Sequence, residues 1–185
     1  MDERWEFLFA DADAQFDALR REEMTAEAAD RSRREFALVG LVDRLRGAVG
    51  TTLEIWLDTG PIGGTVRRVG PDWILLGGSG RRETLIPLTA VNAVSGLPDR
   101  TAAPGSEGMV EARLDLRYAL RRMARDRVPV RVVLRGGRSA SGTFDRVGRD
   151  FAEFAELLPG DARRAGAVRA VRSIPLGALL VVRAP

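Results

Sequence analysis

The sequence predicts a mainly β protein with added helices: two tandem five-stranded β-barrels, each preceded by a helix, and an N-terminal amphipathic helix. Three observations predict this fold. A ten-residue stretch occurs twice, apolar residues alternate before each copy, and apolar residues near the N-terminus recur with helical spacing. With 185 residues, 45% of them hydrophobic, the chain is long enough for two small domains with real cores.

Residues 1–23 are predicted to form an acidic amphipathic helix. Apolar residues recur there at spacings of three and four, as on one face of a helix. The other positions are mostly acidic, so an anionic membrane would repel the helix. We expect the apolar face to pack on the protein's own barrels, and the alternative is that it docks into a groove on a partner or on a second copy of the chain. The candidate partner contacts on this face are Trp5, Leu8, Phe9 and Phe16.

The duplicated stretch covers residues 64–73 and 142–151. Gly-Thr-Val-Arg-Arg-Val-Gly-Pro-Asp-Trp aligns without gaps on Gly-Thr-Phe-Asp-Arg-Val-Gly-Arg-Asp-Phe, and six of the ten positions are identical. Each copy follows a segment of alternating apolar residues and precedes an Ile-Pro-Leu sequence. The order of the parts is therefore duplicated, and not one motif alone.

Each unit reads as a helix followed by five strands. Apolar residues at helical spacing within 36–49 and 116–123 predict the two helices. Alternation around Ile55 and Val132 predicts a first strand with one buried face, and a Gly-containing turn follows each. Gly64 and Gly142 begin the second strands, where a glycine permits a tight bend.

The second half of each unit is predicted from its turns. Val-Gly-x-Asp turns the chain, and the third strand then starts at Trp73 or at Phe151, which we expect to be buried. Proline ends the fourth strand at Ile-Pro-Leu, and residues 90–94 or 178–182 form a short fifth strand that closes the barrel.

These residues resemble the Sm-like family and, more broadly, SH3-like small barrels. Leu-Glu-Ile-Trp-Leu-Asp-Thr-Gly followed by Gly64 and Asp72 is similar to the family's first motif, as is Val-Arg-Val-Val-Leu-Arg-Gly-Gly followed by Gly142 and Asp150. The resemblance implies an N-terminal helix, a bent five-stranded sheet and nucleic-acid binding. The family places a polar residue for an RNA base shortly after the motif Asp, whereas this chain has Trp-Ile-Leu and Phe-Ala-Glu there. Asp72 and Asp150 are therefore interpreted as turn residues, with ligand contact as the alternative.

We place the boundary between the two domains in a linker. Residues 98–108 have the Pro, Gly, Ser and charge content of an exposed connector. The expected organisation is the N-terminal helix at 1–23, the first helix and barrel at 24–97, the linker, and the second helix and barrel at 109–185.

The charge layout suggests two kinds of partner. Residues 1–40 hold 11 acids and 6 arginines, whereas residues 111–185 hold 16 arginines and 8 acids. The basic second half predicts attraction to the phosphates of RNA or DNA. The candidate phosphate contacts lie in the second unit and its long loop, at Arg146, Arg149, Arg163 and Arg164. The alternative is a protein interaction or assembly module without a nucleic-acid ligand.

The composition argues against most catalytic designs. The chain has no cysteine and no histidine, so it lacks the usual zinc ligands, thiol nucleophiles and imidazole bases. We expect a non-catalytic protein without cofactor or metal. The acidic N-terminus and the lack of a long apolar run predict a soluble cytoplasmic protein, neither exported nor in the membrane. Because open barrels leave free strand edges, we expect a small homo-oligomer, with a dimer as the first expectation.

Overall fold

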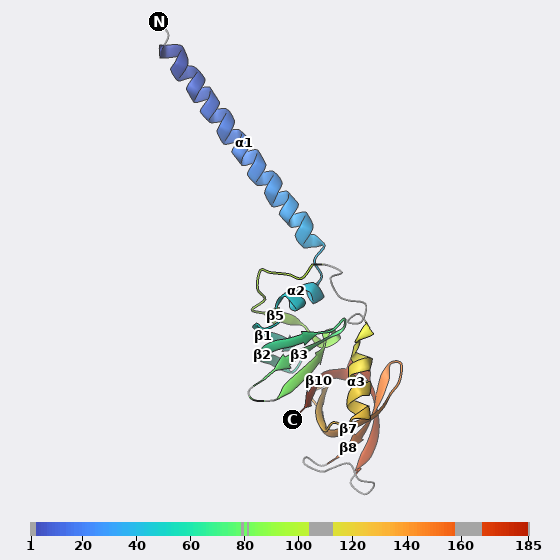
Figure 1. Ribbon diagram of the computed structural model, residues 1–185. Helices are drawn as coiled ribbons and strands as arrows, with labels where there is room; N and C mark the ends of the chain where they lie inside the picture. Colours follow the sequence, from blue (N-terminus) through green and yellow to red (C-terminus); the bar gives the residue numbers. More distant parts are fainter. Residues whose placement is uncertain (1–2, 79, 81, 104–112, 158–167, 185) are drawn as a thin grey trace. The chain divides into compact units, whose positions relative to one another are not determined.

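The computed structural model describes residues 3–78, 80, 82–103, 113–157 and 168–184, with side chains from Arg20 onward. The described residues form a mainly β protein of ten antiparallel strands and three α-helices, as predicted (Figure 1). The chain divides into two units, Met1–Val39 and Gly40–Pro185.

The first unit is one long helix, α1 (Glu3–Ala37), which continues past residue 23 without a break. The helix predicted over residues 36–49 is divided, because Phe36 belongs to α1 and α2 (Leu41–Gly47) begins after Gly40. Gly40 has extended backbone angles, which interrupt the predicted helix. Gly40 is the N-cap residue of α2. Within the described residues, no helix is long and apolar enough to span a membrane.

The second unit repeats one order of elements twice. Repeat 1, residues 41–95, consists of α2, β1 (Thr52–Leu57), β2 (Gly60–Val69), β3 (Trp73–Gly77), β4 (Glu83–Pro87), the short 3-10 helix η1 (Leu88–Ala90) and β5 (Ala93–Ser95). Repeat 2, residues 116–184, consists of α3 (Leu116–Arg125), β6 (Val130–Leu134), β7 (Ser139–Val147), β8 (Phe151–Glu156), β9 (Ala170–Pro175), the 3-10 helix η3 (Leu176–Ala178) and β10 (Leu179–Ala184). The predicted duplication of parts is thus present in the fold.

Hydrogen bonding joins all ten strands into one open sheet with the order β5-β1-β2-β3-β4-β10-β6-β7-β8-β9. Within each repeat the fifth strand pairs with the first, as β5 with β1 and β10 with β6. The fourth strand of repeat 1 pairs with the fifth strand of repeat 2. Two separate, closed barrels are therefore not confirmed. The physical reason is that an unpaired strand edge readily accepts another strand, and β4 accepts β10.

The bend of the second strand is also duplicated. Its register shifts between Val66 and Arg68 in β2 and between Phe144 and Arg146 in β7, at equivalent positions. A bulge of this kind bends a strand and increases its twist. Gly64 and Gly142 lie just before these bulges, where the neighbouring strand comes very close. A Cβ at Gly64 would lie 2.9 Å from the Gly77 carbonyl oxygen, and one at Gly142 would overlap the Ala155 carbonyl oxygen.

The core consists of two clusters that cross the boundary between the repeats. The cluster of repeat 1 includes Leu180 and Val181 of β10. The cluster of repeat 2 includes Trp73 and Leu85 of repeat 1, next to a Phe144–Phe154 pair whose ring centroids are 5.3 Å apart. Each repeat thus completes the other's core.

The prediction that Phe151 is buried is wrong, since 38% of it is exposed, whereas its counterpart Trp73 is only 6% exposed. The physical reason is their place in the chain. Trp73 is covered by repeat 2, and within the described residues no third repeat follows to cover Phe151.

The first part of the predicted linker is held against α2. Arg100 donates from Nε to the Gly47 carbonyl at 2.6 Å, and the Ala102 N–H donates to the Asp43 carbonyl at 3.1 Å. Residues 104–108 of the linker lie outside the described residues.

Candidate assembly interface

The two repeats meet along a seam whose backbone is the β4–β10 pair. Leu85 lies opposite Val182, and Thr84 lies opposite Arg183. Leu85 and Val182 are both almost fully buried. The seam is therefore a strand-to-strand contact with an apolar centre, of the kind that joins separate β proteins.

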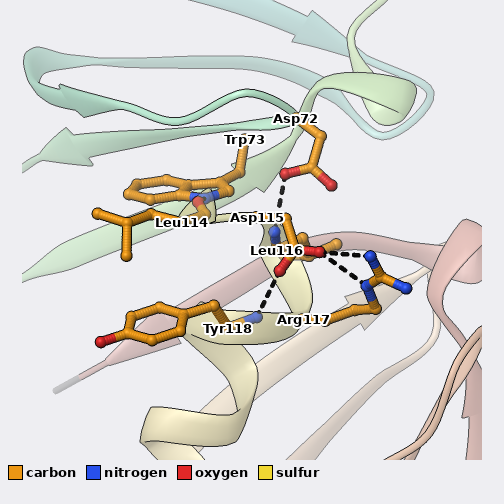
Figure 2. Close-up of polar contacts among 7 residues, drawn as sticks. All are labelled: Asp72, Trp73, Leu114, Asp115, Leu116, Arg117 and Tyr118. Carbon is orange, nitrogen blue, oxygen red and sulfur yellow. Dashed lines mark hydrogen bonds and ion pairs between the residues drawn. The ribbon is translucent and has the colours of Figure 1, made fainter. Parts of the chain in front are cut away.

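Trp73 is the main side chain of the seam. It lies at the start of β3 in repeat 1, and its indole Nε1 donates to the Leu114 carbonyl at 2.7 Å, just before α3 of repeat 2 (Figure 2). The ring packs in the cluster that contains Leu116 and Leu120 of α3. A buried aromatic ring whose polar atom is also paired combines apolar burial with a directional contact.

Asp72, next to Trp73, holds the first turn of α3. Its Oδ1 accepts from the Leu116 N–H at 2.7 Å, while Oδ1 of Asp115, the N-cap residue, accepts from the Tyr118 N–H at 2.8 Å. Arg117 closes this arrangement with an ion pair to Asp115 at 2.6 Å (Figure 2). Two of the helix's N-terminal N–H groups are thus paired, one of them by the other repeat.

The two carboxyls have pKa values displaced in opposite directions. Burial raises the pKa of Asp72, against the opposing effect of the Leu116 N–H. Partial burial alone would raise the pKa of Asp115. The Tyr118 N–H and the Arg117 guanidinium outweigh this effect, and the pKa of Asp115 is lowered. Such a pair can mark an acid and a base at an active site. Here, however, each carboxylate is engaged by a backbone N–H of α3, so the observed role is to position a helix.

A second contact lies at the first hairpin of each repeat. Arg135, between β6 and β7, forms an ion pair with Asp58, between β1 and β2, at 3.1 Å. Its guanidinium also donates to the Thr89 carbonyl of repeat 1 at 3.1 Å and to the Gly177 carbonyl of repeat 2 at 2.8 Å. Arg135 and Asp58 occupy equivalent positions in the two repeats, so this ion pair joins the corresponding hairpins across the seam.

The predicted phosphate contacts are only partly described. Arg146 of β7 donates from Nε and Nη2 to the two carboxylate oxygens of Glu153 at 2.7 and 3.0 Å, and this pairing raises the pKa of Arg146. Its guanidinium is therefore already matched to a carboxylate. Arg149 is exposed in the turn before β8. Arg163 and Arg164 lie outside the described residues.

The other predicted residues fall into two groups. Trp5, Leu8, Phe9 and Phe16 lie in α1, and their side chains are outside the described part of the structure. Asp150 lies in the turn before β8, where its carbonyl accepts from the Leu176 N–H at 2.8 Å, just as the Asp72 carbonyl accepts from Leu88 at 2.9 Å.

Sequence reasoning missed the seam and an arginine-rich segment. Residues 115–127, which contain α3, carry five arginines and two aspartates. The signal that could have identified the segment is its arginines, which stand between apolar positions of the helix. Across the described residues, no group of three or more acidic side chains is placed to hold a metal ion.

No protein-family model, curated protein or solved structure matches this chain. The resemblance to Sm-like barrels therefore stays a prediction from the sequence.

Proposed function

We propose that this protein is a non-catalytic assembly module, made of two tandem small barrels of the Sm-like or SH3-like kind that share one open sheet. Its task is to join protein chains through the free edges of its terminal strands. The observation that supports this most directly is the seam, because it is an edge-to-edge contact between two units of the same design.

Each repeat has two edges, its fourth strand and its fifth. The seam uses the fourth strand of repeat 1 and the fifth strand of repeat 2, which leaves β5 and β9 at the two ends of the sheet. An exposed edge carries unpaired N–H and C=O groups that can bind another strand. A chain with one such contact inside and the same two kinds of edge outside is suited to joining partners in series.

Recovery of the tagged full chain from its own cells tests this function. We expect a particle that contains protein beyond one chain and that keeps its size after nuclease treatment. The proposal would be contradicted if the particle shrinks to the size of one chain after nuclease treatment. It would also be contradicted if only a single chain is recovered before the treatment.

Nucleic-acid binding is the second candidate function, and α3 is the observation that favours it. Residues 115–127 carry a net charge of +3 from five arginines and two aspartates. The side chains of Arg122 and Arg125 are 65% and 72% exposed, so solvent weakens their ion pairs with Asp126. A cluster of arginines can attract phosphates in a salt-dependent way.

Titration of labelled single-stranded RNA and duplex DNA against the full chain tests this candidate. R121E/R125E should weaken binding about tenfold at low salt, since each reversal removes a phosphate contact and adds repulsion. R67E/R68E, which reverses two exposed arginines on β2 of repeat 1, is the charge-matched control. An equal loss of affinity in both variants would show that only net charge matters. If the unchanged chain does not bind at low salt, nucleic-acid binding is rejected as a function.

A further inference from the structure

The two ends of the sheet are the counterparts of the two strands that meet in the seam. In the duplicated order, β9 corresponds to β4 and β5 corresponds to β10. The equivalence extends to register, since Trp73 lies opposite Pro87 and Phe151 lies opposite Pro175. The seam therefore occurs once inside the chain. The described residues also contain the two strands, β5 and β9, that could form a second seam between chains.

The apolar residues of the seam also have counterparts at these ends, and there they are uncovered. Trp73 and Leu116 are 6% and 5% exposed inside the seam. Their counterparts Phe151 and Leu41 are 38% and 47% exposed. Leu41 corresponds to Leu116 because each stands four residues before a fully buried helix residue, Leu45 or Leu120. The same kind of side chain is thus buried where the two repeats meet and exposed at the two ends of the sheet.

We propose that a second copy of this chain occupies each end, with β9 and Phe151 of one copy bound to β5 and Leu41 of the next. This inference rests on the proposed assembly function and names its partner. The contact is heterologous, so copies add head to tail, and they close into a ring if the rotation between successive repeats permits.

Charge favours the same partner. A second seam brings Arg135 of one copy near Asp58 of the next, and these two residues already pair with each other at 3.1 Å inside each chain. Opposite charges therefore meet at each junction.

The second seam is weaker than the first. Phe151 has no indole N–H to donate, and Ser173 takes the place of the buried Leu85. Less apolar area and one fewer hydrogen bond predict an association that is reversible and depends on concentration.

Light scattering and sedimentation of the full chain test the proposal. The protein concentration is varied from about 1 to 100 μM, which covers the dissociation constants typical of transient complexes. We expect the mass to rise from 20.2 kDa toward multiples of that value. F151E blocks one end and L41E blocks the other, so each variant alone should stay at the mass of one chain. Mixed together they still offer one intact pair of ends, and the mixture should form a particle of two chains.

The control is Y118E, which changes a residue exposed to 46% on α3, a helix that packs on β7. It should self-associate like the unchanged chain. Melting curves of all variants show that the fold is retained.

Two results would overturn the inference: an unchanged chain that stays at 20.2 kDa throughout, or a mixture of F151E and L41E that does not associate. If the purified chain is a monomer while the nuclease-resistant particle from cells contains another protein, the assembly function stands and the second copy is rejected. If both experiments give a lone chain, the assembly function itself is rejected.

Discussion

Gly142 shows how one residue determines the spacing of two strands. A Cβ at this position would overlap the carbonyl oxygen of Ala155 on the neighbouring strand, whereas a Cβ at Gly63 would have its nearest neighbour, the Leu53 carbonyl oxygen, at 3.9 Å. We therefore expect G142A to lower the free energy of unfolding by about 1 to 3 kcal/mol, because β7 and β8 must move apart. G63A, the matched control, should change it by less than about 1 kcal/mol. Urea titrations followed by circular dichroism measure both, and equal effects would contradict the close approach.

Asp72 contributes to stability in a way that depends on pH. Burial raises the pKa of its carboxyl above the ordinary value of 3.8, so over the window just above that value the folded chain binds more protons than the unfolded chain. Stability from this group is therefore lost as the pH rises through the window. D72N keeps an oxygen for the Leu116 N–H and removes the charge, so it should gain stability relative to the unchanged chain as the pH rises above 3.8.

Thermal melts of the unchanged chain and D72N at matched pH values measure this difference. Asp115, whose lowered pKa acts with the opposite sign, is present in both chains, and its negative charge is one of the causes that raise the pKa of Asp72. D72A is the control for the hydrogen bond, since it removes the same charge but leaves the Leu116 N–H without this acceptor, and it should be about 1 kcal/mol less stable than D72N at every pH. Parallel stability curves for the unchanged chain and D72N would show that the charge on Asp72 has no cost.

At the scale of elements, β3 and β8 begin with equivalent aromatic residues in different surroundings. Trp73 is almost fully buried in the seam and donates to the Leu114 carbonyl, whereas Phe151 is partly exposed. W73A should therefore lower the free energy of unfolding by about 3 to 5 kcal/mol. F151A should lower it by about 1 to 2 kcal/mol, because less apolar area is lost. Chemical denaturation at low protein concentration measures both, and an F151A cost as large as that of W73A would place Phe151 in the core after all.

The strands inside each repeat could be predicted from the sequence, because alternation, turns and duplication are local patterns. The pairing of β4 with β10 could not, since it joins strands from different repeats and depends on which edges meet. The pattern around Trp73 and Phe151 is nearly the same, yet one residue is buried and the other is not. One difference between the copies does bear on it: Leu85 in repeat 1 is replaced by Ser173 in repeat 2. That change from an apolar to a polar residue distinguishes a covered strand from an uncovered one.

At the scale of the molecule, the shared core makes the two repeats interdependent. Leu180 and Val181 of repeat 2 fill the core of repeat 1, and Trp73 and Leu85 of repeat 1 fill that of repeat 2. Neither repeat can lose its fold without exposing apolar residues of the other. The unit Gly40–Pro185 should therefore unfold in one cooperative step, as a single domain does.

A destabilising change in one repeat, read by a probe in the other, tests this cooperativity. In a W5F/W73F background the remaining tryptophan, Trp56, lies on β1 of repeat 1 and does not belong to the core cluster that contains Phe154. F154A removes a fully buried ring from repeat 2 and should cost about 3 to 5 kcal/mol. Because the cores interlock, tryptophan fluorescence and far-ultraviolet circular dichroism should move to the same lower midpoint in urea. M24A, at an exposed position of α1 in the other unit, is the control that should move neither midpoint. If F154A instead shifts only part of the circular dichroism signal while the tryptophan midpoint stays in place, the repeats are independent domains and the seam is a contact that forms after each has folded.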